Sequence, residues 1–461
     1  MIRLSLQEAA RAMNGRLVGA DAIFTDVSTD TRTLRDGELF FALKGPNFDA
    51  HDYLDRAERA AAVVVDRAVT VSTPHIQVTD TLTALGDLAR HWRLKFRRPL
   101  VGVTGSNGKT TVRAMTAAVF AAPGFMENRV HATQGNFNNA VGVPLTLFGL
   151  DPERHDYAVL EMGANHPGEI AYLTTLAQPD AAVITNAGPA HLEGFGDLDG
   201  VARAKGELFA GMPETATAVL NYDDPRCGVW ETLASNRPRL SFGLECEADI
   251  RAQWRPCDGG SRVHLRTPAG AADLTLPVPG KHNVYNALAA TGLALAVGAP
   301  LERIVAGLEG FQAVQGRMQA CAAIRGARLF DDTYNANPAS LAAGLDVLTA
   351  QPGRPWLALG DMGELGAEAA RMHRDCGLRA KEQGVERLFA LGPLAARAAD
   401  AFGPGAEVFA DAEALITRLR AELESDVRLL VKGSRVMRME RVAAALMDTA
   451  NNNDNHGDGA P

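Results

Sequence analysis

The stretch "LVGVTGSNGKTT", residues 100–111, decides the fold. An apolar strand runs straight into a glycine-rich turn, and a helix is expected to begin just after it, at Lys109. The first backbone N–H groups of such a helix lack partners and carry partial positive charge, which suits phosphate. Gly102 stands one residue further from Gly108 than the strict phosphate-loop spacing allows. We therefore predict a phosphate-binding loop of unusual length; a plain turn with a chance Gly-Lys-Thr is the alternative.

The residues of this turn suit a nucleotide. Gly105 and Gly108 would let the backbone close around phosphate groups, and Lys109 would supply a cation. Thr110 would offer its hydroxyl to Mg²⁺. A phosphate loop alone leaves a kinase, a switch GTPase, a motor and a ligase open, so the choice among these classes depends on other parts of the chain.

Strand-then-helix units continue after the loop. Apolar segments such as 156–163 and 180–188 alternate with helical patterns, which predicts a parallel sheet covered on both faces. Residues 238–279 are short, turn-rich segments, so we expect an antiparallel edge there. Five further units, beginning with "ARLFDDTY" at 327–334, predict a second open sheet of the Rossmann kind.

The whole pattern predicts an α/β protein of three domains. Short apolar runs at 38–43 and 61–66 indicate a small α/β unit, and Pro99 before the apolar strand indicates a boundary near residue 98. The predicted parts are an N-terminal domain at 1–98, a central nucleotide-binding domain at 99–312, a C-terminal Rossmann-like domain at 313–449 and a disordered tail at 450–461.

Composition narrows the classes of partner. The chain has 461 residues, a net charge of −9 and no basic run, which argues against a nucleic-acid partner held by phosphate contacts. Its five cysteines are widely spaced and form no CxxC pair, which favours reduced thiols in the cytosol. The start of the chain is charged where a signal peptide would be apolar, and no apolar run approaches membrane-spanning length. We expect a cytoplasmic protein without membrane insertion.

Two polar residues are expected at the same sheet edge as the loop. Glu161 ends "DYAVLE" and His191 follows "DAAVITN", so both should lie beyond the carboxyl ends of parallel strands, where ligands bind. A carboxylate suits Mg²⁺, whereas an imidazole is a less usual ligand for so hard an ion. Each has a plainer alternative: Glu161 as a helix-capping or surface carboxylate, and His191 as a hydrogen-bonded loop histidine.

Two predicted helices carry further candidates. Lys205, in "VARAKGELF", is interpreted from the pattern alone as a solvated helix lysine. The segment "GKHNVYNALAA" places His282, Asn283 and Asn286 at the start of another helix, where amides can bind a purine edge. The alternative is that Asn283 is the N-cap of a core helix.

These motifs together resemble one family. The ATP-dependent Mur ligases of bacterial cell-wall synthesis are similar to this chain in six motifs that occur in the same order, and they share the longer phosphate loop: "GVTGSNGKTT", "QGNFNNAVGVPLTL", "LEMGANHPGEI", "ITNAGPAHLEGFG", "KGELF" and "PGKHNVYNALAA". The resemblance covers about residues 1–448.

The outer parts of the chain narrow the resemblance. The segment "STDTRTLRDGELFFALKGPNFDAHDY" resembles the UDP-sugar-binding domain of the members that add the third and the last amino-acid units. The segments "DDTYNANPAS" at 331–340 and "LGDMGELG" at 359–366 are similar to the D-alanyl-D-alanine-adding members, and the DNPR motif of many third-residue ligases is absent. A third-residue ligase is the nearest alternative, and a kinase or nucleotide switch is the alternative from another class.

The resemblance implies an acyl-phosphate mechanism that uses ATP and two Mg²⁺ ions. It implies UDP-N-acetylmuramoyl-tripeptide and D-Ala-D-Ala as substrates, and we expect a monomer. The catalytic residues that it implies are Lys109, Glu161, His191, Lys205 and Arg317. The implied metal ligands are Thr110, Glu161, His191 and, after carbamylation by CO2, Lys205. The implied nucleotide contacts are Gly105, Ser106, Asn107, Gly108, Lys109, Thr110, Thr111, Asn138, Asn139, Asn283, Asn286 and Asp332.

Two sets of residues are implied for the other substrates. At the UDP end they are Ser28, Thr29, Asp30, Arg32, Lys44 and Asn47, for which a solvated loop is the alternative. At the dipeptide end they are Tyr334, Asn335, Asn337 and Asp361. The alternative for the Asn-rich turn before Pro338 is a helix cap. Lys432 and Ser434 would hold a carboxylate or simply form a turn.

Overall fold

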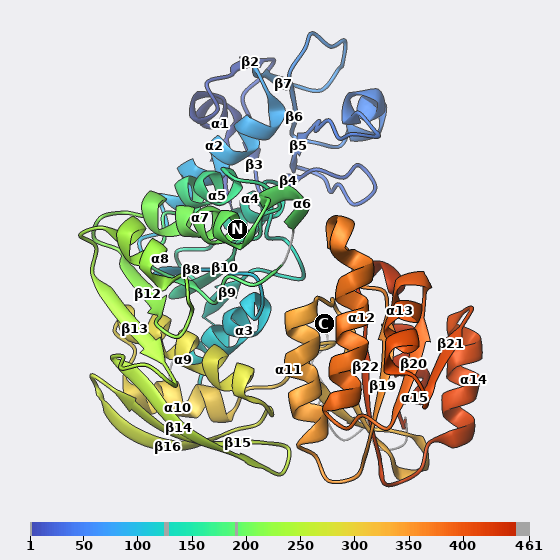
Figure 1. Ribbon diagram of the computed structural model, residues 1–461. Coiled ribbons are helices and arrows are strands. Elements are labelled where there is room, and N and C mark those ends of the chain that lie inside the picture. The colour runs from blue at the N-terminus through green and yellow to red at the C-terminus, as the bar shows by residue number, and fades with distance from the viewer. Residues whose placement is uncertain (1, 124–128, 190–191, 449–461) are drawn as a thin grey trace.

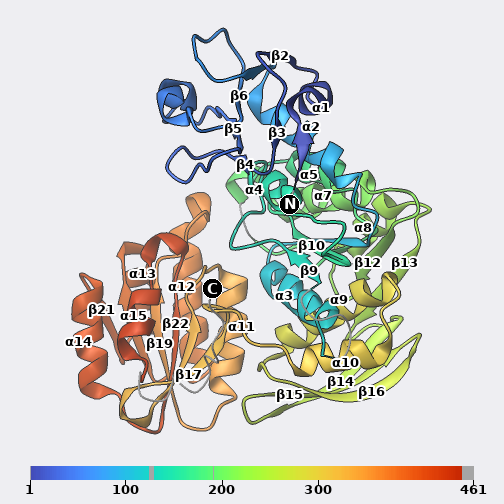
Figure 2. The same ribbon diagram turned by 180° about the vertical axis from the view of Figure 1, so that it is seen from behind.

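The computed structural model describes residues 2–123, 129–189 and 192–448, and it has an α/β architecture (Figure 1). Three main sheets of five, nine and six strands follow one another along the chain, and most neighbouring strands in them are parallel. The predicted fold class is therefore confirmed. Figure 2 shows, as Figure 1 does, the N-terminal part above the central part and the C-terminal part beside it. The predicted residue limits of the domains stay predictions.

The N-terminal part is built on a sheet of order β2-β7-β6-β5-β4. The apolar runs predicted as strands form β5 and β6, which lie inside this sheet and are buried. The elements are β1 (Leu4–Ser5), α1 (Leu6–Ala12), β2 (Arg16–Val18), β3 (Ile23–Phe24), β4 (Val27–Ser28), β5 (Leu39–Phe41), the 3₁₀ helix η1 (Ala50–Ala57), β6 (Ala62–Val65), β7 (His75–Gln77) and α2 (Thr81–Arg93).

Helix α2 fastens the N-terminal part to the central part. At the end of α2, the buried guanidinium of Arg93 donates to the carbonyl oxygens of Ala177 (2.8 Å) and Gln178 (3.0 Å), at the end of a central helix. Because α2 is held in this way, its first turn can bring Leu82 and Thr83 to the cavity described below.

The central sheet has the order β16-β15-β14-β13-β12-β11-β8-β10-β9. Its strands are β8 (Leu100–Thr104), β9 (Val130–Ala132), β10 (Tyr157–Glu161), β11 (Ala181–Ile184), β12 (Thr217–Asn221), β13 (Arg239–Gly243), β14 (Ile250–Cys257), β15 (Gly260–Thr267) and β16 (Gly270–Leu276). Its helices are α3 (Lys109–Phe120), α4 (Gly142–Phe148), α5 (Glu169–Ala177), α6 (Leu192–Phe195), α7 (Leu198–Gly211), α8 (Cys227–Ala234), α9 (Lys281–Ala296) and α10 (Leu301–Glu309).

The predicted antiparallel edge at 238–279 is only partly right. Strands β14, β15 and β16 do pair antiparallel. Strand β13, however, is parallel to both of its neighbours. The reason is that α8 crosses over between β12 and β13, so the chain re-enters the sheet in the same direction.

Helices cover both faces of the central sheet. On one face α3, α9 and α10 pack into a buried cluster that includes Met115 and Leu288, and on the other α4, α5 and α7 pack into a cluster that includes Leu173 and Leu208. Strand β8 is buried along its whole length. The glycine-rich turn at its carboxyl end is therefore the point where the backbone leaves the core.

The C-terminal part is a second doubly covered sheet, of order β17-β18-β22-β19-β20-β21. The five predicted strands are all present and parallel, and the antiparallel edge strand β17 was missed. The elements are β17 (Gln319–Ala322), η2 (Ile324–Gly326), β18 (Arg328–Asp332), α11 (Pro338–Thr349), β19 (Arg354–Gly360), η3 (Gly366–Glu368), α12 (Ala369–Glu382), β20 (Arg387–Leu391), α13 (Pro393–Phe402), β21 (Ala406–Phe409), α14 (Ala412–Glu422), β22 (Val427–Lys432), η4 (Arg435–Met437) and α15 (Glu440–Leu446). Within the described ranges no helix is long and apolar enough to cross a membrane.

Candidate functional site

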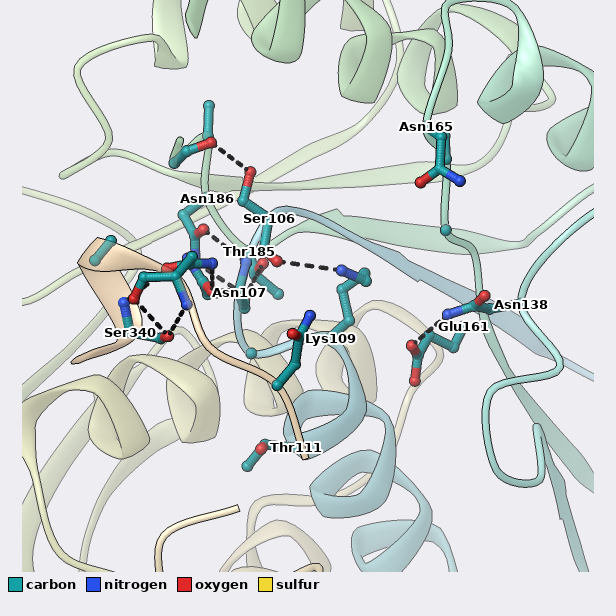
Figure 3. Close-up of a pocket in the computed structure, with 18 of the residues that line it drawn as sticks. Ser106, Asn107, Lys109, Thr111, Asn138, Glu161, Asn165, Thr185, Asn186 and Ser340 are labelled. Carbon is teal, nitrogen blue, oxygen red and sulfur yellow. Dashed lines mark hydrogen bonds between the residues drawn. The ribbon is translucent and has the colours of Figure 1, made fainter. Parts of the chain in front are cut away.

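A cavity of about 1180 Å³ lies between the central and C-terminal sheets. The carboxyl ends of β8, β10, β11 and β18 all open onto it, and α2 adds two residues from the N-terminal part. The structure brings together at this cavity many of the residues singled out from the sequence: Ser106, Asn107, Gly108, Lys109, Thr111, Asn138, Asn139, Glu161, His282, Asn283, Asn286, Arg317, Asp332, Tyr334, Asn335, Asn337 and Lys432. Figure 3 shows several of them around the glycine-rich turn.

Two glycines give the turn its shape. Gly105 has a φ of 140°, and a Cβ built on it would lie 1.9 Å from the hydroxyl oxygen of Thr185. Gly108, the residue before α3, has a φ of 84°, and its Cβ would lie 2.4 Å from Oδ1 of Asn286. Both positions combine a left-handed backbone with a close neighbour, so a larger residue would displace the turn.

The turn is held in place by Asn186, which the sequence analysis did not single out. Its carbonyl accepts from the Ser106 N–H at 3.0 Å, and its Oδ1 accepts from the Asn107 N–H at 3.0 Å. Asn186 follows β11 in "VITNAG", so its position at a strand end was the available signal.

Lys109 is folded back onto the turn. Its Nζ donates to the carbonyl oxygens of Gly105 (2.8 Å) and Ser106 (3.2 Å). Burial lowers the pKa of Lys109, with the nearby charge of Glu161 opposing the shift and that of Arg317 adding to it. An incoming anion would replace carbonyl contacts with a stronger charged one.

Glu161 presents a buried oxygen that has no hydrogen-bond partner. The residue is 2% exposed, and Oε1 accepts from Nδ2 of Asn138 at 2.8 Å. Its Oε2 is buried without a hydrogen bond, and the Nε of Arg113 lies 4.0 Å from it. A buried carboxylate oxygen left in this state is expected to have a ligand, and a carboxylate oxygen is what Mg²⁺ prefers. The donor set around Glu161 therefore fits this ion.

His191, a predicted metal ligand, lies outside the described residues. In the described ranges no three His, Cys, Asp or Glu side chains gather in a way that would hold a metal. Any metal held by these residues would thus need most of its ligands from phosphate oxygens, hydroxyls or water.

The interpretation of Lys205 as a solvated helix lysine is wrong. Lys205 is only 2% exposed, because its side of α7 faces inward; Nζ donates to the carbonyl of Ala164 at 3.3 Å and lies 5.2 Å from the ring centre of Phe195. Burial, together with the charge of Lys109, lowers the pKa of Lys205 to about 7. A large fraction of this amine is therefore neutral near neutral pH, which makes it a nucleophile.

The alternative that Asn283 caps a helix is also wrong. Helix α9 has Gly280 at its N-cap, and Asn283 lies within the first turn, where its Nδ2 donates to the Pro279 carbonyl at 2.8 Å. Asn286 donates to Oδ1 of Asn283 at 3.1 Å, and both residues are buried beside the cavity. This bonding fixes the orientation of both amides.

Arg317 connects the C-terminal part to the turn. Its Nη2 donates to the Thr110 hydroxyl at 3.2 Å, and its guanidinium carbon lies 4.0 Å from the ring centre of Tyr334. Its Nε is buried and has no hydrogen-bond partner. The guanidinium is thus held over an aromatic ring, and its Nε–H can still donate to a ligand.

Polar residues at the end of β18 are largely engaged with the protein itself. Asp332 accepts from the Met318 N–H at 3.2 Å and forms a buried ion pair with Lys432. The Nζ of Lys432 also donates to the Asn335 carbonyl at 3.1 Å, which ties β22 to the turn after β18. Lys432 therefore holds this turn, whereas Ser434 does not line the cavity.

Two residues predicted for the dipeptide serve as helix caps. Asn337 is the N-cap of α11, in a reciprocal pair with Ser340, as the capping alternative predicted. Asp361 lies away from the cavity lining, and its Oδ1 accepts from the N–H groups of Leu394 (3.0 Å) and Ala395 (2.6 Å) in the first turn of α13. Their predicted contacts with the dipeptide stay predictions.

The residues predicted for the UDP end do not line the cavity between the central and C-terminal sheets; they are Ser28, Asp30, Arg32, Lys44 and Asn47. Arg32 is exposed and donates to both carboxylate oxygens of Asp30, which lowers the pKa of that carboxyl to about 2. Lys44 and Asn47 are exposed in the loop after β5. Ser28 is buried, so only Arg32, Lys44 and Asn47 of this group are exposed on the surface of the N-terminal part.

Comparison with known proteins gives consistent matches. The models of the Mur ligase middle domain and of the Mur ligase glutamate ligase domain match residues 103–294 and 316–435. The UDP-N-acetylmuramoyl-tripeptide–D-alanyl-D-alanine ligase of Escherichia coli (strain K12) is 43% identical, over 97% of this chain and 99% of the relative. A crystal structure of MurF from Acinetobacter baumannii is 33% identical with a TM-score of 0.90, covering 97% of this chain and 99% of that one. A MurF structure from Thermotoga maritima in complex with ADP is 28% identical with a TM-score of 0.83, covering 91% and 96%.

Proposed function

This chain belongs to the Mur ligase family, and from that premise we propose that it is the ATP-dependent ligase that joins D-Ala-D-Ala to UDP-N-acetylmuramoyl-tripeptide. The observation that carries the proposal is full-length similarity to a relative of that name, with 97% of this chain covered. The cavity supports it, because the phosphate turn and the "DDTYNANPAS" segment form opposite walls of one space.

The proposed reaction has two steps, phosphorylation of the carboxylate and attack by the amine. A carboxylate oxygen of the tripeptide attacks the γ-phosphorus of ATP, the bond to the bridging oxygen breaks, and ADP leaves with its electron pair. The amine of D-Ala-D-Ala then attacks the acyl carbon, phosphate leaves, and the amine loses a proton. The first step brings two anions together, so Lys109 and the amides at the start of α3 would stabilise the charge that collects on the phosphate oxygens.

We propose that two Mg²⁺ ions bind at this site. Thr110 and Glu161 would hold the first, and Glu161 with His191 the second; the oxygen of Glu161 that lacks a partner supports this assignment. Magnesium would supply neutralisation of phosphate charge and a template for in-line attack. Lys205, as a carbamate formed with CO2, would add a carboxylate to the second ion; its low pKa supports this, since carbamylation needs a neutral amine.

We propose the remaining nucleotide contacts from the positions of the residues at the cavity. Asn138 and Asn139 lie near the loop, Asn283 and Asn286 present fixed amides for adenine, and Asp332 would bind the ribose. Arg317 would use its free Nε on the γ-phosphate. On the amino-substrate side we propose Tyr334, Asn335 and Asp361, whereas the side chain of Asn337 is engaged with Ser340 and Asn107. At the UDP end we propose Ser28, Asp30, Arg32, Lys44 and Asn47. We further propose a cytoplasmic monomer with no nucleic-acid partner.

A phosphate-release assay with UDP-tripeptide and a panel of amines tests the function. We expect ADP, phosphate and amide with D-Ala-D-Ala, and little turnover with diaminopimelate or lysine on the corresponding UDP-dipeptide. Turnover with those amines would instead identify a third-residue ligase. A stable phosphorylated product without amide would identify a kinase and overturn the proposal.

A further inference from the structure

Three asparagine side chains connect the central sheet, the phosphate turn and the C-terminal part. Asn186 follows β11, Asn107 lies in the turn, and Asn337 begins α11. The Asn107 N–H donates to Oδ1 of Asn186, and Nδ2 of Asn186 donates back to the Asn107 carbonyl, both at 3.0 Å. Nδ2 of Asn337 then donates to Oδ1 of Asn107 at 2.8 Å. We call these three residues the asparagine chain; Figure 3 shows Asn107 and Asn186 side by side.

Asn186 fixes the backbone of Asn107 completely. It pairs with both the N–H and the carbonyl of Asn107, and the Thr185 hydroxyl donates to the same carbonyl at 2.6 Å. The backbone of Asn107 therefore cannot rotate without the loss of several hydrogen bonds. The side-chain oxygen of Asn107 faces the C-terminal part, where it accepts from Nδ2 of Asn337.

The partner on the other side is equally fixed. Oδ1 of Asn337 accepts from the Ser340 N–H at 2.8 Å, and the Ser340 hydroxyl accepts from the Asn337 N–H at 3.0 Å. With its oxygen committed to the cap of α11, the amide of Asn337 directs its nitrogen at the turn. Helix α11 and the phosphate turn are thus joined by one hydrogen bond between two prepositioned side chains, 230 residues apart in sequence.

We propose that Asn337 is a positioning residue that fastens the C-terminal part to the phosphate turn while the acyl phosphate awaits the amine. The proposal rests on the proposed function. When the bond is present, the cavity stays closed and water is excluded from the acyl carbon. When it is lost, a water oxygen can bond to that carbon as the bond to phosphate breaks, which regenerates the carboxylate and releases phosphate and a proton without amide.

Asn337→Ser is the decisive variant. Serine caps a helix about as well as asparagine but is too short to reach Asn107, so folding should be preserved. We expect amide formation to fall roughly threefold to tenfold, the usual effect of one lost hydrogen bond. Phosphate release per amide should rise above the one-to-one stoichiometry of the parent enzyme, with the KM for ATP little changed. A purely structural role would not move that stoichiometry.

Two further variants complete the test. Asn107→Ala should raise the same ratio, and adding Asn337→Ser to it should change nothing more, since both remove one bond. Asp411→Ala removes a cap from α14 in the same part of the molecule, so it should lower thermal stability and leave the ratio unchanged.

Independent, multiplying effects of Asn107→Ala and Asn337→Ser would overturn the proposal. So would an Asn337→Ser enzyme that keeps the one-to-one ratio and shows only a raised KM for D-Ala-D-Ala. Failure of the proposed function is distinguishable, because the parent enzyme itself would then form no amide.

Discussion

The two walls of the cavity use their polar side chains differently. On the central wall, Glu161 has a buried oxygen without a hydrogen bond. The Nζ of Lys109 donates to two loop carbonyls, which a phosphate can replace. On the C-terminal wall, Asp332 pairs with Lys432 and accepts from a backbone N–H. Asn337 likewise accepts from a backbone N–H in α11 and donates to the phosphate turn. Polar groups on the central wall are thus available to bind a ligand, whereas those on the C-terminal wall mostly bond to other protein groups. Arg317, whose Nε has no partner, is the exception.

The sharpest test of the central wall is Glu161→Gln. Glutamine keeps an oxygen for Asn138 but removes the negative charge that a divalent cation needs. We expect ligation to fall about a hundredfold or more, with partial recovery at high Mg²⁺. Phosphate release across a Mg²⁺ titration measures both effects.

A matched control is Glu153→Gln, which makes the same change at an exposed carboxylate in the loop before β10. It should leave the rate and the Mg²⁺ dependence unchanged. If Glu161→Gln lost activity equally at every Mg²⁺ concentration, the assignment of Glu161 to the metal would be wrong.

The second test concerns Arg317, the residue of the C-terminal wall whose Nε has no hydrogen bond. Arg317→Lys keeps the charge but loses the planar group that stacks on Tyr334, so we expect kcat to fall roughly tenfold to a hundredfold. Arg435 also lies over the ring of Tyr334, at 5.6 Å, but its side chain is 67% exposed. Arg435→Lys is therefore the control in steady-state kinetics, and an equal loss in both variants would show that only the ring contact matters.

The sequence predicted the central wall better than the C-terminal one. A strand that ends in a glycine-rich turn fixes the backbone locally, and Glu161 lies at a strand end, so topology alone places both at one edge. Whether a side chain there meets a ligand or another residue depends on contacts between distant segments. That is why the pairing of Asp332 with Lys432, 100 residues later, escaped prediction.

Burial was the other property that local pattern did not reveal. Lys205 sits on a helix with charged neighbours, which is typical of a solvated face, yet α6 and the segment around Ala164 cover it. Asn186 was missed for a related reason. Asparagine is common in the turn after a strand, so its type gave no signal. Its role depends on the phosphate turn lying next to the end of β11, where the Asn107 N–H donates to its side chain.

The pH dependence of ligation tests the burial of Lys205. Because its pKa is lowered to about 7, the neutral amine is scarce at pH 6 and abundant above pH 7. At a fixed concentration of dissolved CO2 we expect the rate of carbamylation, which follows the neutral amine, to rise about fivefold between pH 6 and pH 7, and ligation to rise with it. Trapping of labelled CO2 on Lys205 over the same pH range measures this directly; a Lys205→Ala enzyme that is active and insensitive to bicarbonate would contradict it.

The smallest effect is expected at the N-terminal surface, far from both walls. Arg32 is exposed and pairs with Asp30, and an exposed pair of this kind contributes little to stability. Arg32→Ala should leave the melting temperature within about 1 °C and raise the KM for UDP-tripeptide only a fewfold, with the KM for ATP unchanged. Exposed Arg11→Ala on α1 is the control for charge alone. An unchanged KM for UDP-tripeptide would show that Arg32 does not contact this substrate. The proposed substrate-binding residues supported by the structure would then be those on the two walls of the cavity.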